Sequence, residues 1–291
     1  MTSVGFLGTG IMGGPMATRL AAAGFSVAAW NRSREKAAAL KGVTVAPTAG
    51  IAAAGAEVVV CMLSSGAACD AVLLGPGGVV AAMTPSTTLV VMSSIPVGTA
   101  RAQAAACAAR GISYVDAPVS GGERGAMEGT LAIMVGGDAA VVAALVPVFS
   151  PLGRATHVGP VGSGQLAKLA NQLIVASSIC AVAEALLLAE RGGADPAQVR
   201  EALMGGFADS TVLRQHGLRM VEGNFVPGGP AKYQIKDTGT ALALASSLGL
   251  TLPVAEQVDH LFRDLVAHGG GDLDHSAALV ELRRRNAEIN A

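Results

Sequence analysis

A glycine-rich segment near the N-terminus has the composition and spacing of a phosphate-binding turn. Its sequence, GTGIMG, fits the pattern GxGxxG and lies between an apolar strand pattern at residues 3–7 and a helical pattern. Glycine permits a tight turn, so the N–H groups at the start of the helix can face a pyrophosphate. The pattern also fits a turn without a ligand, but a second strand pattern ends at Trp30, as in a dinucleotide-binding βαβ unit. The predicted cofactor-binding residues of this turn are Gly8, Thr9, Gly10, Ile11, Met12 and Gly13.

The residues after the second strand pattern indicate which nicotinamide dinucleotide binds. An acidic residue at this position accepts a hydrogen bond from the ribose 2′-hydroxyl of NAD and repels the 2′-phosphate of NADP. This chain has Asn31 there, followed by Arg32, Ser33 and Lys36, whose guanidinium, hydroxyl and ammonium groups suit a phosphate. We therefore predict NADP as the cofactor, with NAD as the alternative, and interpret Arg34 as part of a solvated helix start.

Four further motifs follow in an order that is typical of one enzyme family. Residues 116–122 read DAPVSGG, residues 129–137 read GTLAIMVGG, residues 162–172 read GSGQLAKLANQ, and residues 236–237 read KD. These segments resemble the corresponding motifs of the β-hydroxyacid dehydrogenase family, which includes the 3-hydroxyisobutyrate dehydrogenases, and the resemblance continues through the rest of the chain. It implies an oxidoreductase that transfers a hydride between a nicotinamide and a small β-hydroxyacid or semialdehyde.

The first of these motifs resembles the substrate-binding segment of the family. The backbone N–H groups of Ser120, Gly121 and Gly122, with the Ser120 hydroxyl, are suited to hold a substrate carboxylate. A fixed carboxylate would place the neighbouring carbonyl or carbinol carbon over the nicotinamide. A structural turn after a strand is the alternative interpretation.

The resemblance assigns catalysis to Lys168, which would donate a proton to the carbonyl oxygen during reduction and accept it during oxidation. Without the motif, a lysine whose stem lies along a helix surface would explain this residue equally well. Asn171 and Gln172 follow one helical turn later on the same side and are predicted to contact the substrate. Several family members have asparagine in place of Gln172, so the sequence leaves open which amide contacts the substrate.

Further cofactor contacts are expected from strand ends and from the second half of the chain. By resemblance, Met62, Leu63 and Ser94 end sheet strands on the side where open α/β sheets bind ligands. By resemblance, Lys236 would contact the nicotinamide half of the cofactor. An ordinary exposed Lys236-Asp237 pair is the alternative.

The substrate is less well determined than the reaction. Residues 183–186, 200–208 and 216–220 resemble the 2-hydroxy-3-oxopropionate (tartronate semialdehyde) reductases of the family. The sequence NRS at residues 31–33 is more similar to the NADPH-dependent succinic semialdehyde and glyoxylate reductases, and 3-hydroxyisobutyrate dehydrogenase is a further alternative. Outside the family, the competing interpretations are an imine reductase and a non-catalytic NADP-binding module.

The chain must supply two kinds of structure around these motifs. Strand patterns at residues 3–7, 26–30, 57–62, 88–92, 113–115 and 131–135 alternate with alanine-rich segments and predict a parallel sheet. A helical pattern runs without proline from Gly164 to Glu190, and shorter ones follow at 196–204, 210–221, 233–248, 253–267 and 275–289. We predict an α/β protein with a Rossmann-type domain at 1–161 and an all-helical substrate and oligomerisation domain at 162–291.

Composition excludes several other classes of function. A formal net charge of -1, without a long run of like charge, argues against nucleic acid as a partner. The uncharged stretch from Ala71 to Ala100 is divided by prolines, and the N-terminus shows no secretion signal, so we expect no membrane span and a cytoplasmic protein. The long apolar helix favours a homodimer or homotetramer.

The cysteines and histidines do not form recognisable ligand patterns. The four cysteines are widely spaced and lie in apolar segments, which indicates reduced thiols. The five histidines show no spacing that would bring two imidazoles onto one helix face. We therefore expect neither disulfides nor a metal.

Overall fold

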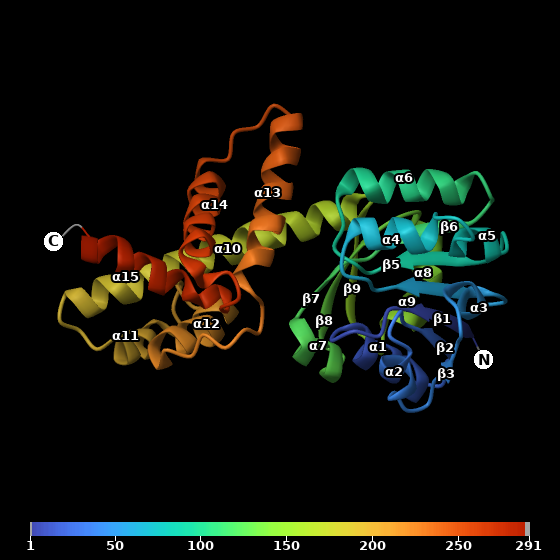
Figure 1. Ribbon diagram of the computed structural model, residues 1–291, viewed down its shortest axis with the longest axis horizontal. Coiled ribbons are helices and arrows are strands. Elements are labelled where there is room, and N and C mark those ends of the chain that lie inside the picture. Colours follow the sequence, from blue (N-terminus) through green and yellow to red (C-terminus); the bar gives the residue numbers. More distant parts are fainter. Residues whose placement is uncertain (1, 289–291) are drawn as a thin grey trace. The chain divides into compact units, whose positions relative to one another are not determined.

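Strands occupy only the first part of the chain, where short β-branched runs alternate with alanine-rich segments. The computed structural model describes residues 2–288, and backbone contacts divide the chain into two units, residues 1–168 and 169–291. Among the described residues all strands lie in the first unit, and the second unit is helical (Figure 1). The predicted fold class is confirmed, whereas the boundary between residues 161 and 162 stays a prediction.

The sheet of the first unit has nine strands in the order β3-β2-β1-β4-β5-β6-β8-β7, and β9 pairs with β8. From β3 to β6 the strands are parallel, so their carboxyl ends meet at one edge of the sheet. The order reverses at β1, which lies between β2 and β4, and ligands bind at such reversals in open α/β sheets. The strands are β1 (Ser3–Leu7), β2 (Ser26–Trp30), β3 (Thr44–Val45), β4 (Val58–Cys61), β5 (Thr88–Val91), β6 (Ser113–Asp116), β7 (Val119–Ser120), β8 (Leu131–Gly136) and β9 (Gly153–Gly159).

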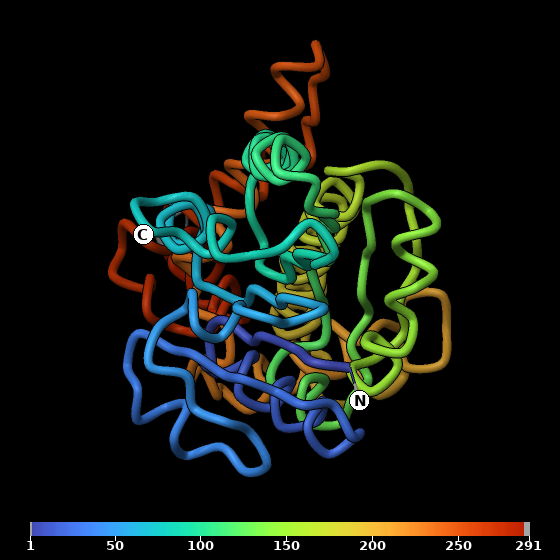
Figure 2. The backbone as a smooth tube through the Cα atoms, turned by 90° about the vertical axis from the view of Figure 1, so that its right-hand side faces the viewer, coloured from blue at the N-terminus to red at the C-terminus, as the bar shows by residue number. Residues whose placement is uncertain are grey.

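Alternate side chains of the central strands enter two separate cores, one on each face of the sheet. Phe6 packs into one core and the next residue, Leu7, into the other, as the period of two in a strand requires. Residues of α1, α7, α8 and α9 complete the first core, and residues of α3 to α6 complete the second (Figure 1 and Figure 2). The helices are α1 (Gly13–Ala22), α2 (Arg34–Ala38), α3 (Ala49–Ala53), α4 (Gly66–Leu73), α5 (Val79–Ala82), α6 (Val97–Ala108), α7 (Gly122–Glu128), α8 (Ala139–Ala144) and α9 (Val146–Phe149).

All six predicted strands are present, each within one residue of its predicted ends. The sequence did not reveal β3 and β7, which have only two residues each, or β9. Strand β9 contains Arg154, Thr156 and His157 and is largely exposed, so it lacks the apolar run by which the other strands were recognised.

The second unit is built around α10 (Ser163–Arg191), which also contains the point of division between the units. Ile179 and Ala183 of α10 are fully buried and lie in one core with Phe262 of α14. The other helices are α11 (Pro196–Leu203), α12 (Thr211–Glu222), α13 (Ala231–Ser247), α14 (Pro253–Leu265) and α15 (Ala278–Glu288). A π-type turn at Val266–Gly270 and a 3₁₀ turn at His275–Ala277 connect the last two. The predicted helices are all present, except that the segment predicted as one helix at 275–289 begins with the 3₁₀ turn before α15, and residue 289 lies outside the described residues.

Helix α10 is the one helix among residues 2–288 that is long and apolar enough to cross a membrane. This is weak evidence for a membrane span, since the core helices of soluble proteins have the same length and composition.

The start of α10 approaches the sheet so closely that only glycine fits there. A Cβ atom on Gly164 would lie 2.5 Å from the carbonyl oxygens of both Asp116 and Met134, which belong to β6 and β8. A Cβ atom on Gly136 would lie 2.7 Å from the amide nitrogen of Gly164. The first turn of α10 therefore packs backbone against backbone.

We predict that Gly164→Ala destabilises the protein by about 1–3 kcal/mol, because the added methyl group forces apart two strands and a helix. Gly98→Ala is the matched control, since Gly98 lies in α6 with no atom near its Cβ position, and alanine should stabilise that helix by about 0.5–1 kcal/mol. Thermal unfolding of both variants measures the difference. Equal melting temperatures would contradict the close packing at Gly164.

Candidate active site

The predicted dinucleotide turn lies between β1 and the first turn of α1, at the carboxyl edge of the sheet. Gly8 has a φ of +99°, and a Cβ atom there would lie 2.3 Å from the carbonyl oxygen of Met62. A Cβ atom on Gly13 would lie 1.9 Å from the carbonyl oxygen of Gly8. In contrast, nothing lies within 4 Å of the Cβ position of Gly10. Gly8 and Gly13 are thus required by packing, and Gly10 leaves open space for a ligand.

The residues that would bind the adenosine end of the cofactor follow β2. The Asn31 side chain accepts a hydrogen bond from the Thr9 amide (3.0 Å) and donates one to the Ser33 carbonyl oxygen (3.0 Å). It therefore joins the glycine turn to the loop that carries the predicted phosphate-binding residues. Arg32 and Lys36 are exposed, and Ser33 is half-buried at the start of α2.

Two neighbouring strands contribute the remaining predicted crevice residues of the first unit. Met62 and Leu63 follow β4, and Ser94 follows β5, so all three lie at the same edge as the glycine turn. The loops are tied together, because the Ser93 hydroxyl accepts a hydrogen bond from the Leu63 amide (2.7 Å).

These residues fit a dinucleotide. The Thr9 hydroxyl oxygen is buried and has no hydrogen-bond partner among residues 2–288, so this turn has an unused polar atom. The amides of Gly14 and Met16 in α1 already donate to the carbonyl oxygens of Gly10 and Met12, and Pro15 has no N–H, so a pyrophosphate would be received by amides of the turn before the helix. The exposed Arg32 guanidinium supplies positive charge after β2.

The predicted carboxylate-binding segment also lies in the first unit. Ser120 ends β7 and is half-buried, while Gly121 and Gly122 have φ values of +136° and +63° at the start of α7. Residues with side chains rarely adopt these values, so the glycines allow the chain to turn. No atom lies within 4 Å of the Cβ position of Gly122, which leaves its backbone accessible to an anion.

Helix α10, which carries Lys168, begins on a buried carboxylate. Asp116 ends β6 and is fully buried, and its two carboxylate oxygens accept hydrogen bonds from the amides of Gly162 (2.7 Å) and Gln165 (2.8 Å). Burial raises the pKa of Asp116, and these N–H donors oppose that shift. Because both oxygens are acceptors, the contacts fit the ionised form, which also stabilises the helix N-terminus.

Gln165 makes a second connection to the same edge of the sheet. Its side-chain amide donates to the Ser93 carbonyl oxygen (2.9 Å) and accepts from the Ile95 amide (3.0 Å). Lys168 follows less than one turn later and is half-buried. The start of the lysine helix is therefore fixed beside the loop after β5, which was predicted to line the dinucleotide crevice.

The predicted residues of the second unit form a short chain of hydrogen bonds. The Asn171 amide donates to the Gln172 side-chain oxygen (2.9 Å), and the Gln172 amide donates to the Asp237 carboxylate (2.6 Å). Lys236 precedes Asp237 in α13 and is exposed.

The roles of Asp116, Gln165 and Asp237 could not be predicted from the sequence, because hydrogen bonds between distant residues leave no pattern along the chain. Asp116 and Gln165 lie within two of the motifs, but no spacing connects them.

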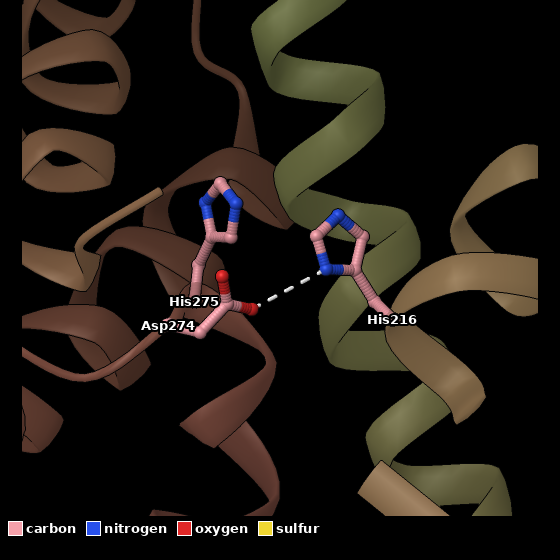
Figure 3. Close-up of side chains that lie close together, drawn as sticks. All are labelled: His216, Asp274 and His275. Carbon is pink, nitrogen blue, oxygen red and sulfur yellow. Dashed lines mark ion pairs between the residues drawn. The ribbon is translucent and has the colours of Figure 1, made fainter. Parts of the chain in front are cut away.

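A cluster of His216, Asp274 and His275 was also missed, because the histidines are far apart in sequence (Figure 3). Their ligand atoms lie within 4.8 Å of one another. Asp274 is buried, and its oxygens already accept from Ser276 and from the amides of Gly228 and Gly229. An Arg219 nitrogen lies 3.7 Å from the carboxylate, which disfavours a cation there. We interpret the cluster as an anchor for the loop before α13.

Comparisons with known proteins identify the family of this chain. Residues 3–161 match the model of the NAD binding domain of 6-phosphogluconate dehydrogenase, and residues 162–282 match that of the NAD-binding domain of NADP-dependent 3-hydroxyisobutyrate dehydrogenase. The chain is 45% identical over 283 residues to the 2-hydroxy-3-oxopropionate reductase of Escherichia coli K12, and 96% of each chain is covered. The chain belongs to the β-hydroxyacid dehydrogenase family. This β-hydroxyacid dehydrogenase is an NAD(P)-dependent oxidoreductase that acts on CH–OH groups.

Other relatives support the same assignment. A probable 3-hydroxyisobutyrate dehydrogenase-like protein of Arabidopsis thaliana is 37% identical, with 98% of this β-hydroxyacid dehydrogenase and 88% of the relative covered. The structure of the Mycobacterium tuberculosis 3-hydroxyisobutyrate dehydrogenase with L-serine superposes with a TM-score of 0.88 at 33% identity, covering 97% of this chain and 99% of that one. An imine reductase from Pseudomonas, at 21% identity and a TM-score of 0.61, shares the fold.

We predict that the His275 imidazole makes the stability depend on pH. Burial, with repulsion by His216, lowers the pKa of His275 from 6.5 to about 4, although Asp274 opposes this shift and Arg219 adds to it. The unfolded chain thus binds a proton more readily between pH 6.5 and pH 4, so stability is lost as the pH falls through this window, by at most about 3 kcal/mol.

Urea unfolding at several pH values tests this, with His275→Gln as the comparison because its amide does not titrate. The variant should lose less stability than the wild type between pH 6.5 and pH 4. Parallel curves for the two proteins would contradict the assignment.

Proposed function

We propose that this protein is an NADPH-dependent reductase of small semialdehyde acids, with tartronate semialdehyde (2-hydroxy-3-oxopropionate) as its best substrate. The observation that carries the proposal is the anchoring of α10. Asp116 and Gln165 hold the start of this helix at the edge where the glycine turn and the loops after β4 and β5 lie, and Lys168 follows directly. A lysine at this position can donate a proton to the carbonyl oxygen of a substrate.

The chemistry needs a hydride, a proton and a fixed substrate. A bound nicotinamide would supply the hydride to the aldehyde carbon. The backbone amides of Ser120, Gly121 and Gly122 would hold the substrate carboxylate, so that the carbonyl group is oriented. Lys168 would give a proton to the carbonyl oxygen as the alcohol forms, and would take it back in the oxidation direction. Asn171 and Gln172 are the proposed amide contacts, and Lys236 is a proposed cofactor contact.

The preference for NADP is proposed from the loop after β2. Asn31 carries no charge that would repel a 2′-phosphate, and Arg32 and Lys36 are exposed cations. Ser33 offers a hydroxyl at the start of α2. The description of the matching second-half model as NADP-dependent supports this choice.

The choice of substrate is supported by the Escherichia coli relative, which is named 2-hydroxy-3-oxopropionate reductase. Succinic semialdehyde or glyoxylate reduction and 3-hydroxyisobutyrate oxidation are the alternatives within the family. A non-catalytic NADP-binding module is the alternative of another class, and the presence of Lys168 argues against it.

We further propose a cytoplasmic homodimer or homotetramer whose other partner is the small substrate, without nucleic acid or membrane. The apolar side chains of Ile174 and Leu188 on α10 are 68% and 76% exposed, and that of Phe207 is fully exposed. A second copy of the chain would cover such surface.

Replacing the proposed proton donor tests the reaction. We expect wild-type protein to oxidise NADPH at 340 nm with tartronate semialdehyde, and Lys168→Ala to lower kcat by about 10²–10⁴-fold. Lys41→Ala is the control, since Lys41 is exposed and outside the proposed site. The panel should include methylmalonate semialdehyde, succinic semialdehyde and glyoxylate. Turnover that is indifferent to Lys168, or absent with every acid, would refute the proposed function.

Substitution of each of two neighbouring arginines by alanine tests the cofactor preference. Arg32→Ala should lower kcat/KM for NADPH by about tenfold and leave that for NADH unchanged, because one contact to a phosphate is lost. Arg34→Ala is the matched control, as an exposed arginine at the start of α2 without a proposed cofactor contact. The same loss in both variants would show that general positive charge, rather than Arg32, selects the phosphate.

A further inference from the structure

Two helices of the first unit, α1 and α7, pack against each other, and each directly follows a segment that is proposed to bind a ligand (Figure 1). Helix α1 begins at Gly13, the last residue of the glycine turn. Helix α7 begins at Gly122, the last residue of the proposed carboxylate-binding segment. Met16 and Leu20 of α1 share a core with Ala126 of α7. A change in the contact between these helices would therefore change how cofactor and substrate lie relative to each other.

Arg19 makes a polar connection between the two helices. It is half-buried in the last turn of α1. Its Nε donates a hydrogen bond to the Pro151 carbonyl oxygen (2.7 Å), and its Nη1 donates one to the Met127 carbonyl oxygen (2.9 Å). Met127 lies in the last turn of α7, where carbonyl groups have no donor further along the helix and a positive charge is favourable. The guanidinium supplies both the donor and the charge.

The turn after α7 leaves room for the guanidinium only because it contains glycine. Gly129 ends α7 with a φ of +72°. A Cβ atom at this position would lie 2.3 Å from Nη2 and 2.5 Å from Cζ of Arg19. The guanidinium thus lies directly against the backbone of the turn, while two carbonyl oxygens hold it from the sides. Such an arginine is confined to one orientation.

The other end of α7 is held by a short pairing. Strand β7, which precedes the helix, consists of Val119 and Ser120 and pairs with Ile133 and Ala132 of β8. Two paired residues restrain the direction of the following helix weakly, so a contact at the far end of α7 has a large effect on where its first residues lie.

We infer that Arg19 is a positioning residue, which holds α7 against α1 so that Ser120–Gly122 presents the substrate carboxylate at a fixed place relative to the bound cofactor. The assignment rests on the proposed function, in which this segment binds the carboxylate. Hydride transfer requires the aldehyde carbon to lie close to the nicotinamide, and a misplacement of about 1 Å can cost about 10²-fold in rate. Arg19 acts on this distance through α7.

Replacing the guanidinium tests the positioning. Arg19→Met keeps an unbranched side chain and removes every donor. We expect kcat/KM for tartronate semialdehyde to fall about tenfold or more, because the carboxylate is no longer held in register with the cofactor. The Kd for NADPH, measured by direct binding, should stay within about twofold, since the glycine turn is unchanged.

Arg110→Met is the matched control. Arg110 also donates to two carbonyl oxygens at a helix, those of Val80 (3.1 Å) and Ala81 (3.2 Å) in α5. It precedes β6 and so lies at the amino edge of the sheet, opposite the proposed site. This variant should change the melting temperature without changing kcat/KM or the Kd for NADPH. An unchanged kcat/KM in Arg19→Met, an equal fall in Arg110→Met, or an equal loss of NADPH binding in Arg19→Met would overturn the inference.

Hydrogen exchange of the ligand-free protein tests the same contact without catalysis. The amides of Gly125 and Thr130 donate hydrogen bonds within the segment 121–130. Their exchange should become about tenfold faster in Arg19→Met and stay at the wild-type rate in Arg110→Met, in which the Ala81 amide of α5 should exchange faster instead. Unchanged exchange in segment 121–130 of Arg19→Met would overturn the inference.

The two experiments distinguish failure of the inference from failure of the proposed function. If the wild-type protein shows no Lys168-dependent turnover with any acid, the proposed function fails, and hydrogen exchange still decides whether Arg19 holds α7. If turnover depends on Lys168 and exchange becomes faster in Arg19→Met while kcat/KM is unchanged, the proposed function stands and the positioning role of Arg19 is wrong.

Discussion

The buried carboxylate of Asp116 is the constraint on which the rest of the first unit depends. An unpaired carboxylate without exposure to water would cost several kcal/mol. Here both oxygens receive N–H donors from the start of α10, and the helix dipole adds to their effect. The hydrogen bonds that compensate for burial of the Asp116 charge also fix the start of α10. Strand β6, the loop after β5 and the turn that carries Lys168 therefore cannot move independently.

Local patterns revealed the elements and motifs but not their connections. Six strands were predicted because short runs rich in β-branched residues alternate with alanine-rich segments, and Lys168 was predicted because its neighbours match a motif. Asp116 and Gln165, 49 residues apart, meet only after the sheet forms, and His216 and Asp274 meet only after the helices of the second unit pack. Strand β9 escaped prediction for a related reason, since its exposed residues pair with β8 through backbone groups that carry no sequence signal.

Asn31 makes two hydrogen bonds that the sequence did not predict. It was expected to contact the cofactor, and that stays a prediction. Its side-chain oxygen and nitrogen are used by Thr9 and Ser33, so its direct effect is to hold the glycine turn against the loop after β2. A carboxylate in its place could still accept from Thr9 but could not donate to Ser33. The absence of an acid here thus shapes the loop as well as removing a charge.

Ligand groups that all candidate acids share would be bound by the backbone, and the group in which the acids differ would be bound by side chains. This division would allow the same reaction with several substrates. The turn at Gly8–Gly13 and the segment at Ser120–Gly122 are proposed to bind through backbone N–H groups, although the amides of Gly8 and Thr9 already donate to Trp30 and Asn31. Such groups suit the pyrophosphate and the carboxylate that all candidate ligands share. What differs between the candidate acids is the group at carbon 2, and only side chains can distinguish a hydroxyl from a methyl group there. Selectivity among these acids should therefore reside in polar side chains of the site, while the lysine and the glycines stay the same.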